Sequence, residues 1–396
     1  MKRALLLILP LFLIATPSVA APKLVSTGLG SIYSAPAGSE ALALSGKNSI
    51  FFRNIENATS DIEIIALDQG QNQVWSTVID SGVDEIATAI SSDPMGNIWL
   101  SGATAIPAVA DTSTSTVGID NPDNVSLDGV AQLRPDMTNI GLWKVSPSGE
   151  VLNTYQLAVP SIPVINSISV THSALTMIGR IDSKPFLLSS SASGVFGKIT
   201  YIGSAKSELN IVVRSADGSA TVYGSSAETI AGKKVTGLRD GVVIKVSKTG
   251  AITSLLRSSA NKGSRSWVSG DSTFLTSGPV IVGKTIETAM TKFTSKLVPV
   301  WTLRLPSSGA SQSLSANGNS YLAFTSRGVI PGIAQWKPTK PSLLVLTVDS
   351  KGVIKAATAL PGLVKPLALQ YSTTRGVVGL ASASDGTVSI FTLVSR

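Results

Sequence analysis

The sequence contains no cysteine, so neither a disulfide nor a thiolate-bound metal can stabilise the fold. There is one histidine, His172, which leaves no second histidine for a zinc site or a nucleophile–base pair, and we interpret it as a structural or surface residue. Charged residues make up only 14% of the chain, and no segment is rich in glutamate, lysine and alanine as a helix would be. Glycine, serine, threonine and branched apolar residues dominate instead, as in short strands joined by tight turns. We therefore expect an all-β protein.

Long hydrophobic runs are also missing, apart from one near the start of the chain. That run extends from Ala4 to Ala15, is interrupted by Pro10, and is shorter than the roughly 20 residues of a membrane-spanning helix. It follows Lys2 and Arg3 and precedes small residues, which is the pattern of a secretory signal peptide. We predict that residues 1–20 are such a signal, with an uncleaved anchor as the alternative. Residues 21–396 then form one domain that is secreted, periplasmic or on the cell surface, without a transmembrane segment.

The two parts of the chain carry opposite charge. Residues 21–170 hold 5 Lys/Arg against 15 Asp/Glu, whereas residues 171–396 hold 25 Lys/Arg against 9 Asp/Glu. Such an asymmetry suggests that one side of the protein faces a polyanion.

A repeat of about 50 residues organises the mature chain. Each copy has an apolar strand that ends in glycine, a variable loop, a second strand, a Ser-x-x-Gly type turn and a third strand. The clearest copies are NIWLSGAT with LWKVSPSGEVLNTYQL (97–104 and 142–157), ATVYGSS with VVIKVSKTGAITSLL (220–226 and 242–256), and SYLAFTS with LLVLTVDSKGVIKAATAL (320–326 and 343–360). The period suits the roughly 40–50 residues of a four-stranded propeller blade.

The two ends of the chain predict how the ring closes. From Leu367 the sequence supplies three strands and no fourth, while KLVSTGL (23–29) follows the signal without partners of its own. If the two ends complete one blade, no inner sheet edge is left unpaired. We therefore predict a seven-bladed β-propeller, with six or eight blades as alternatives, closed by an N-terminal strand that completes the C-terminal blade.

Residues 104–140 interrupt the repeat and are rich in proline, aspartate, asparagine, serine and threonine. We expect a long inserted loop on one face, where functional variation usually concentrates. Within it lie five oxygen-bearing side chains of the kind that bind Ca²⁺: Asp120, Asn121, Asp123, Asn124 and Asp128. Their spacing is not that of an EF-hand, and a solvated turn at residues 120–128 is the alternative.

Two of the copies resemble the bacterial β-propeller repeat family often called SBBP. Its unit reads D-x-x-G-N-x-Y-x-x-G, followed by V-x-K and a turn glycine. The matching positions here are Gly96, Asn97, Trp99 and Gly102 for the first part, and Val243, Lys245 and Gly250 for the second. The resemblance implies a propeller on an exported or surface protein, with no single enzymatic activity.

Candidate binding residues are cationic side chains in loops of the basic part and one loop tryptophan. They are Lys233, Lys234, Arg239, Arg257, Lys262, Arg265 and Trp336. Such a cluster can hold phosphate or carboxylate polymers, although solubilising charge on loop tips is the alternative. Trp336 can stack on a sugar or cover an apolar rim. By contrast, Trp99 and Trp143 lie inside strand patterns, which places them in the core.

These observations favour a non-catalytic exported scaffold that binds a cell-envelope protein or an anionic polymer. A carbohydrate-active hydrolase or lyase is one alternative, although the sequence singles out no carboxylate pair of the kind that glycosidases use. A self-associating surface module is another. We expect no cofactor, no nucleic-acid partner, and a monomer.

Overall fold

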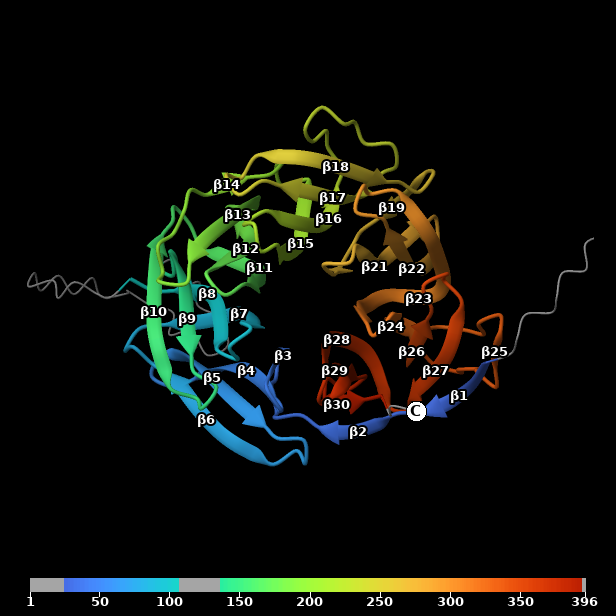
Figure 1. Ribbon diagram of the computed structural model, residues 1–396, viewed down its shortest axis with the longest axis horizontal. Coiled ribbons are helices and arrows are strands. Elements are labelled where there is room, and N and C mark those ends of the chain that lie inside the picture. Colours follow the sequence, from blue (N-terminus) through green and yellow to red (C-terminus); the bar gives the residue numbers. More distant parts are fainter. Residues whose placement is uncertain (1–24, 107–135, 394–396) are drawn as a thin grey trace, which may run out of the picture.

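The computed structural model describes residues 25–106 and 136–393, and throughout these ranges the regular elements are β-strands arranged around a central axis as a β-propeller (Figure 1). No helix in the described residues is long and apolar enough to cross a membrane. The signal predicted at residues 1–20 and the possible calcium ligands at residues 120–128 lie outside the described residues. The inserted loop is therefore seen only at its two ends, beside β8 and β9.

Five separate antiparallel sheets of four strands occur in the described residues. The first contains β3 (Ala41–Ser45), β4 (Asn48–Glu56), β5 (Ser60–Leu67) and β6 (Gln73–Ile79). The second contains β7 (Glu85–Ser92), β8 (Ile98–Thr104), β9 (Asn139–Val145) and β10 (Val151–Ala158). The third contains β11 (Pro163–Val170), β12 (Ala174–Ile181), β13 (Lys184–Ser191) and β14 (Thr200–Tyr201). The fourth contains β15 (Ser207–Arg214), β16 (Ala220–Ser226), β17 (Asp240–Val246) and β18 (Ile252–Ser258). The fifth contains β28 (Leu363–Ser372), β29 (Gly376–Ala383), β30 (Val388–Thr392) and β2 (Ser31–Ser34).

The prediction of seven blades, with six or eight as alternatives, is wrong: the described residues show five blades, each a separate four-stranded sheet, and the other strands form one ten-stranded sheet. The large sheet contains β19 (Gly263–Arg265), β20 (Ser269–Gly270), β21 (Leu275–Val282), β22 (Thr285–Phe293), β23 (Pro299–Ala316), β24 (Asn319–Ser326), β25 (Ile333–Ala334), β26 (Ser342–Val348), β27 (Ile354–Leu360) and β1 (Val25–Leu29). Its continuity comes from β23, which runs for 18 residues and pairs first with β22 and then with β24. Two expected blades are thereby joined through one unbroken strand.

The prediction that residues 23–29 complete the C-terminal blade is also wrong. β1 instead pairs in parallel with β27 and β25 at the edge of the ten-stranded sheet. The next segment, β2, is the one that pairs with β30. Gly30 permits the crossing between the two sheets, because a Cβ there would lie 2.6 Å from Leu360 Cδ2. A side chain at that point would require the end of the Leu360 side chain to shift.

One large hydrophobic cluster lies within the ten-stranded sheet, and several others lie between neighbouring sheets. Phe52 and Ile64 of the first sheet pack with Leu100 and Trp143 of the second. Trp99 and Trp143 are fully buried, which confirms their predicted place in the core. The last sheet meets the first through a cluster that contains Leu42, Phe51, Val378, Leu380 and Ile390. Side-chain packing thus continues from the last sheet to the first.

A glycine in the second strand of a sheet recurs because the neighbouring inner strand approaches it closely. A Cβ at Gly102, Gly179 or Gly224 would lie about 2 Å from a backbone carbonyl oxygen, at 1.9, 2.1 and 2.0 Å respectively. Each inner strand bulges opposite this glycine. The strand-ending glycines of the sequence repeat are therefore sites of backbone contact.

The bulged residue uses its side chain to join one sheet to the next. Thr88 Oγ1 donates to the carbonyl of Ile165 at 2.7 Å, and Asn166 Nδ2 donates to the carbonyl of Leu209 at 2.7 Å. Asn210 Nδ2 continues the series by donating to the carbonyl of Trp267 at 2.8 Å. These bonds place consecutive inner strands side by side around the axis.

Candidate functional site

The structure brings the six predicted cationic residues into one region, formed by the loop between β16 and β17 together with β18 and β19. The loop lies against the next strands because the N–H of Leu238 donates to the carbonyl of Gly263 at 2.8 Å, and the N–H of Arg265 donates to the carbonyl of Arg239 at 2.9 Å. Within this region the cations differ in how far they are neutralised.

Arg257 is neutralised by Asp240. Arg257 Nη1 lies 3.5 Å from Asp240 Oδ2, and the two side chains are 7% and 0% exposed. Burial alone would raise the pKa of Asp240, but the N–H groups of Gly237 and Thr236 and the charge of Arg257 hold it below its usual value. Arg257 also donates from Nε to the carbonyl of Lys233 at 3.1 Å. This pair fastens the loop and leaves little of Arg257 for a ligand.

The three lysines of the region differ in whether their ammonium groups bond within the protein. Lys233 Nζ donates to the carbonyl of Leu255 at 2.5 Å and so helps to fasten the same loop. Lys234 and Lys262 are exposed, and neither side chain has a hydrogen-bond or ion-pair partner in the ranges that the structure describes. These two ammonium groups remain available to an anionic partner.

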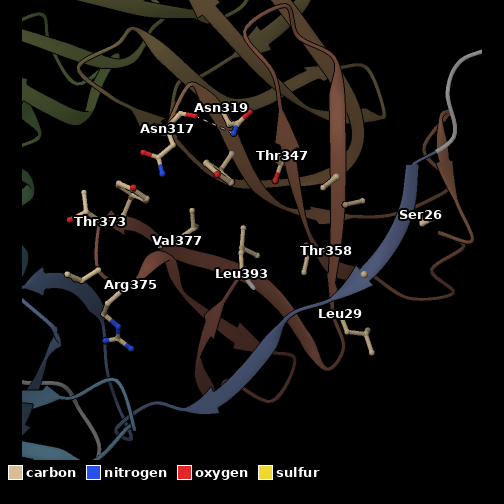
Figure 2. Close-up of a pocket in the computed structure, with 17 residues that line it drawn as sticks. Ser26, Leu29, Asn317, Asn319, Thr347, Thr358, Thr373, Arg375, Val377 and Leu393 are labelled. Atoms are coloured by element: carbon tan, nitrogen blue, oxygen red, sulfur yellow. Dashed lines mark hydrogen bonds between the residues drawn. The ribbon is translucent and has the colours of Figure 1, made fainter. Parts of the chain in front are cut away.

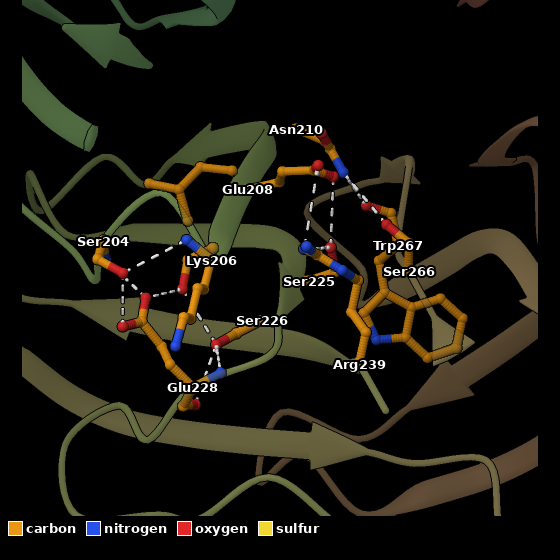
Figure 3. A network of polar contacts seen from close by, with 12 residues as sticks. Ser204, Lys206, Glu208, Asn210, Ser225, Ser226, Glu228, Arg239, Ser266 and Trp267 are labelled. Carbon is orange, nitrogen blue, oxygen red and sulfur yellow. Dashed lines mark hydrogen bonds and ion pairs between the residues drawn. The ribbon is translucent and has the colours of Figure 1, made fainter. Parts of the chain in front are cut away.

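Arg239 belongs to a network of polar contacts that joins β15, β16 and the loop before β17 (Figure 3). Its Nη1 donates to Ser225 Oγ at 3.1 Å and lies 3.9 Å from Glu208 Oε1. Because Glu208 is 57% exposed, this ion pair is screened by solvent and weak. Arg239 therefore keeps a partly uncompensated charge.

Arg265 stacks on a buried aromatic ring. Its guanidinium carbon lies 4.5 Å from the centre of the Trp267 ring, and Nη1 donates to Ser258 Oγ at 2.7 Å. Burial, followed by the charge of Arg304, lowers the pKa of Arg265 to about 10. The side chain is therefore still cationic at neutral pH.

Trp336 lies apart from the cationic region and is only 8% exposed. Its ring packs in a core cluster with Phe324 and Leu344, and Nε1 donates to Ser326 Oγ at 2.9 Å. The ring is therefore not presented for stacking on a sugar. His172 is exposed in the turn between β11 and β12. Among the described residues, no group of three or more histidine, aspartate and glutamate side chains is placed to hold a metal ion.

A groove that the sequence did not reveal lies where β1 and other strands of the ten-stranded sheet meet the turn between β28 and β29 (Figure 2). Its volume is about 530 Å³. The lining is mostly polar and includes Tyr321, Thr347, Thr358, Tyr371 and Arg375. These residues come from five separate segments, so no local sequence motif predicts the groove.

Comparison with solved structures shows a β-propeller fold. The β-propeller domain of the Trilobed protease from Pyrococcus furiosus, described as having an open velcro topology, is 12% identical, covers 92% of this chain and 96% of its own, and has a TM-score of 0.50. The WD40 domain of Neurospora crassa Pan2 is 9% identical, covers 91% of this chain and 90% of its own, and has a TM-score of 0.51. The chain is a β-propeller. At these identities the likeness extends to the fold alone.

No protein-family model and no curated protein sequence matches the chain. The resemblance of the repeats to the SBBP family thus stays a prediction.

Proposed function

We propose that this protein is an exported, non-catalytic propeller that binds an anionic polymer of the cell envelope. The observation that carries the proposal is the unequal charge of the ring. Residues 171–396, named here the basic arc, hold 25 Lys/Arg against 9 Asp/Glu. The basic arc supplies the strands from β12 to β30. A surface with one dominant sign attracts a polymer of the opposite sign over its whole length.

Exposed lysines support the proposal more than the paired arginines do. Arg257 and Arg304 each have a carboxylate partner, Asp240 and Glu287, which reduces what they offer to a ligand. By contrast, several lysine side chains of the basic arc are exposed: Lys184, Lys206, Lys234, Lys248, Lys262 and Lys284. A polyanion would contact these groups and release its counterions, so binding should weaken as salt is added.

The proposal is tested by retention of the full-length mature protein on immobilised polygalacturonate and on heparin. We expect retention at low ionic strength and elution by salt. Lys262→Glu should elute at lower salt than the wild type, whereas Lys47→Glu, the same charge change at an exposed position outside the basic arc, should elute close to it. No retention of the wild type, or equal loss in the two variants, would contradict binding by the basic arc.

An acidic envelope protein is the alternative partner. Crosslinking in cells that leads to one protein, together with no retention on either polymer, would favour that alternative over the polymer. Sequencing the N-terminus of the mature protein tests export, for which we expect a start at residue 21 or 22.

A further inference from the structure

Two grooves adjoin at the hairpin between β23 and β24, whose tip is Asn317–Gly318. The larger is the groove of about 530 Å³ in Figure 2, and the smaller has a volume of about 310 Å³. Asn317 and Asn319 line both of them. We refer to the two together as the hairpin groove.

The larger part presents polar groups that the protein itself leaves unpaired. Tyr321 and Tyr371 are half-buried, with rings that pack against a core cluster, yet neither hydroxyl has a hydrogen-bond partner in the described residues. The hydroxyls of Thr347 and Thr358 are likewise without a partner there. Polar groups in such partly enclosed positions are normally bonded to protein, water or a ligand. Four hydroxyls from four strands therefore converge on one space.

The smaller part adds an aromatic wall and a cation. Trp301 and Lys292 are cross-strand partners on β23 and β22, and both line the groove. The Trp301 ring is held in place because Nε1 donates to the carbonyl of Ser350 at 3.0 Å. Lys292 Nζ donates to Thr273 Oγ1 at 2.5 Å, which fixes the ammonium beside the groove. The Lys292 ammonium has three N–H donors, and this bond uses one of them.

These groups together match one class of ligand. Hydroxyl and amide groups suit a polyhydroxylated ligand, and an aromatic ring suits the apolar face of a sugar. The ammonium of Lys292 suits a carboxylate or sulfate on that ligand. We propose that the hairpin groove binds an acidic oligosaccharide, with its sugar rings along Trp301 and the tyrosines and its acidic group at Lys292. The inference rests on the proposed function, because it assigns the anionic polymer to the class of acidic polysaccharides.

Calorimetric titration tests the proposal with three probes: tetragalacturonate, a chondroitin sulfate tetrasaccharide and the neutral maltotetraose. We expect saturable binding of at least one acidic tetrasaccharide and weaker binding of maltotetraose. The Tyr321→Phe/Tyr371→Phe double variant removes two hydroxyls that make no bond within the protein, so it should fold normally and bind roughly 10-fold more weakly. Tyr201→Phe is the matched control, because Tyr201 is 47% exposed on β14 and lies outside the groove. It should bind as the wild type does.

Lys292→Gln tests the placement of the acidic group. It should reduce the preference for acidic over neutral tetrasaccharide, whereas Lys284→Gln, at an exposed position outside the groove, should not. Absence of saturable binding by the wild type, or equal affinity of the double tyrosine variant and the wild type, would overturn the proposal.

The two proposals fail in different ways. If the polymer is retained through Lys262 while the tetrasaccharides do not bind, the hairpin groove is wrong and the basic arc stands. If the tetrasaccharides bind and the tyrosine variant loses them, the groove stands even when the Lys262→Glu variant is retained like the wild type.

Discussion

Gly224 lies opposite the bulge at Asn210, and its missing side chain sets how close β15 and β16 can come. A Cβ there would lie 2.0 Å from the carbonyl oxygen of Glu208, which is backbone and cannot rotate away. We expect Gly224→Ala to reduce the free energy of unfolding by roughly 2–4 kcal/mol, measured by urea denaturation. Gly328→Ala is the matched control, because a Cβ at Gly328 would meet nothing within 4 Å. Equal stability of the two variants would contradict the close approach.

Glu85 is a carboxyl group that the fold disfavours in its ionised form. Glu85 is fully buried, and this burial raises its pKa. Hydrogen bonds from Ser81 lower the pKa again but only in part, and the charges of Asp61 and Asp80 raise it further. Because the folded pKa lies above the unfolded value, ionisation costs stability as pH rises past about 4. We expect Glu85→Gln to stabilise the protein at pH 7 and to have no such effect below pH 4. Thermal denaturation at both values tests this, and destabilisation at pH 7 would contradict it.

Some of these features could be predicted from the sequence, and others could not. The turn glycines of the repeat, such as Gly149, Gly250 and Gly352, all have positive φ, as their turns require. The burial of Trp99 also followed from its place in an apolar strand. The hydroxyls of Tyr321 and Tyr371 could not be placed in one groove, because they lie 50 residues apart and only the packing of two sheets unites them.

At the scale of the element, the loop between β16 and β17 depends on Asp240. This carboxylate accepts from the N–H groups of Thr236 and Gly237 at 2.9 Å each and pairs with Arg257. Removing its charge leaves a buried guanidinium without a carboxylate partner, so Asp240→Asn should lower the free energy of unfolding by about 3 kcal/mol. Urea denaturation at pH 7 measures this, with Asp217→Asn, at an exposed turn position, as the control.

The same aspartate gives the loop a pH dependence. Since the folded pKa of Asp240 is below its unfolded value, its stabilising effect is complete above about pH 4 and is lost as pH falls through the folded pKa. The difference in stability between the wild type and Asp240→Asn should therefore shrink in acid. A difference that stays constant down to pH 2 would show that the ion pair is not its source.

Two elements show where sequence periodicity stops being informative. The repeat predicts separate blades, yet β23 pairs in its first part with β22 and in its second part with β24, with a register shift between Ser307 and Ser311. β1 has the mixed polar and apolar composition of an outer strand, and this composition is equally compatible with parallel pairing to β27 or with antiparallel pairing to β30. Periodicity states which face of a strand is buried, but it does not state which edge the strand joins.

At the scale of the whole molecule, neighbouring sheets share their cores, and this should make unfolding cooperative. The cluster of Phe51 joins the last sheet to the first, and the cluster of Leu209 joins the third to the fourth on another part of the ring (Figure 1). No sheet can then lose its packing without exposing apolar surface of the next. We expect Phe51→Ala and Leu209→Ala each to lower the midpoint of a single thermal transition, at a cost of roughly 3–5 and 2–5 kcal/mol respectively.

Scanning calorimetry distinguishes cooperative unfolding of the whole ring from separate unfolding of the individual sheets. In a cooperative ring the calorimetric and van't Hoff enthalpies agree for the wild type and for both variants. If the sheets unfolded separately, Phe51→Ala and Leu209→Ala would each move a different transition and leave the other in place. That outcome would mean that the shared clusters contribute less to stability than the strand pairing inside each sheet. It would also mean that the cationic loop beside β17 can open without disturbing the hairpin groove, so that ligands of the two sites would bind independently.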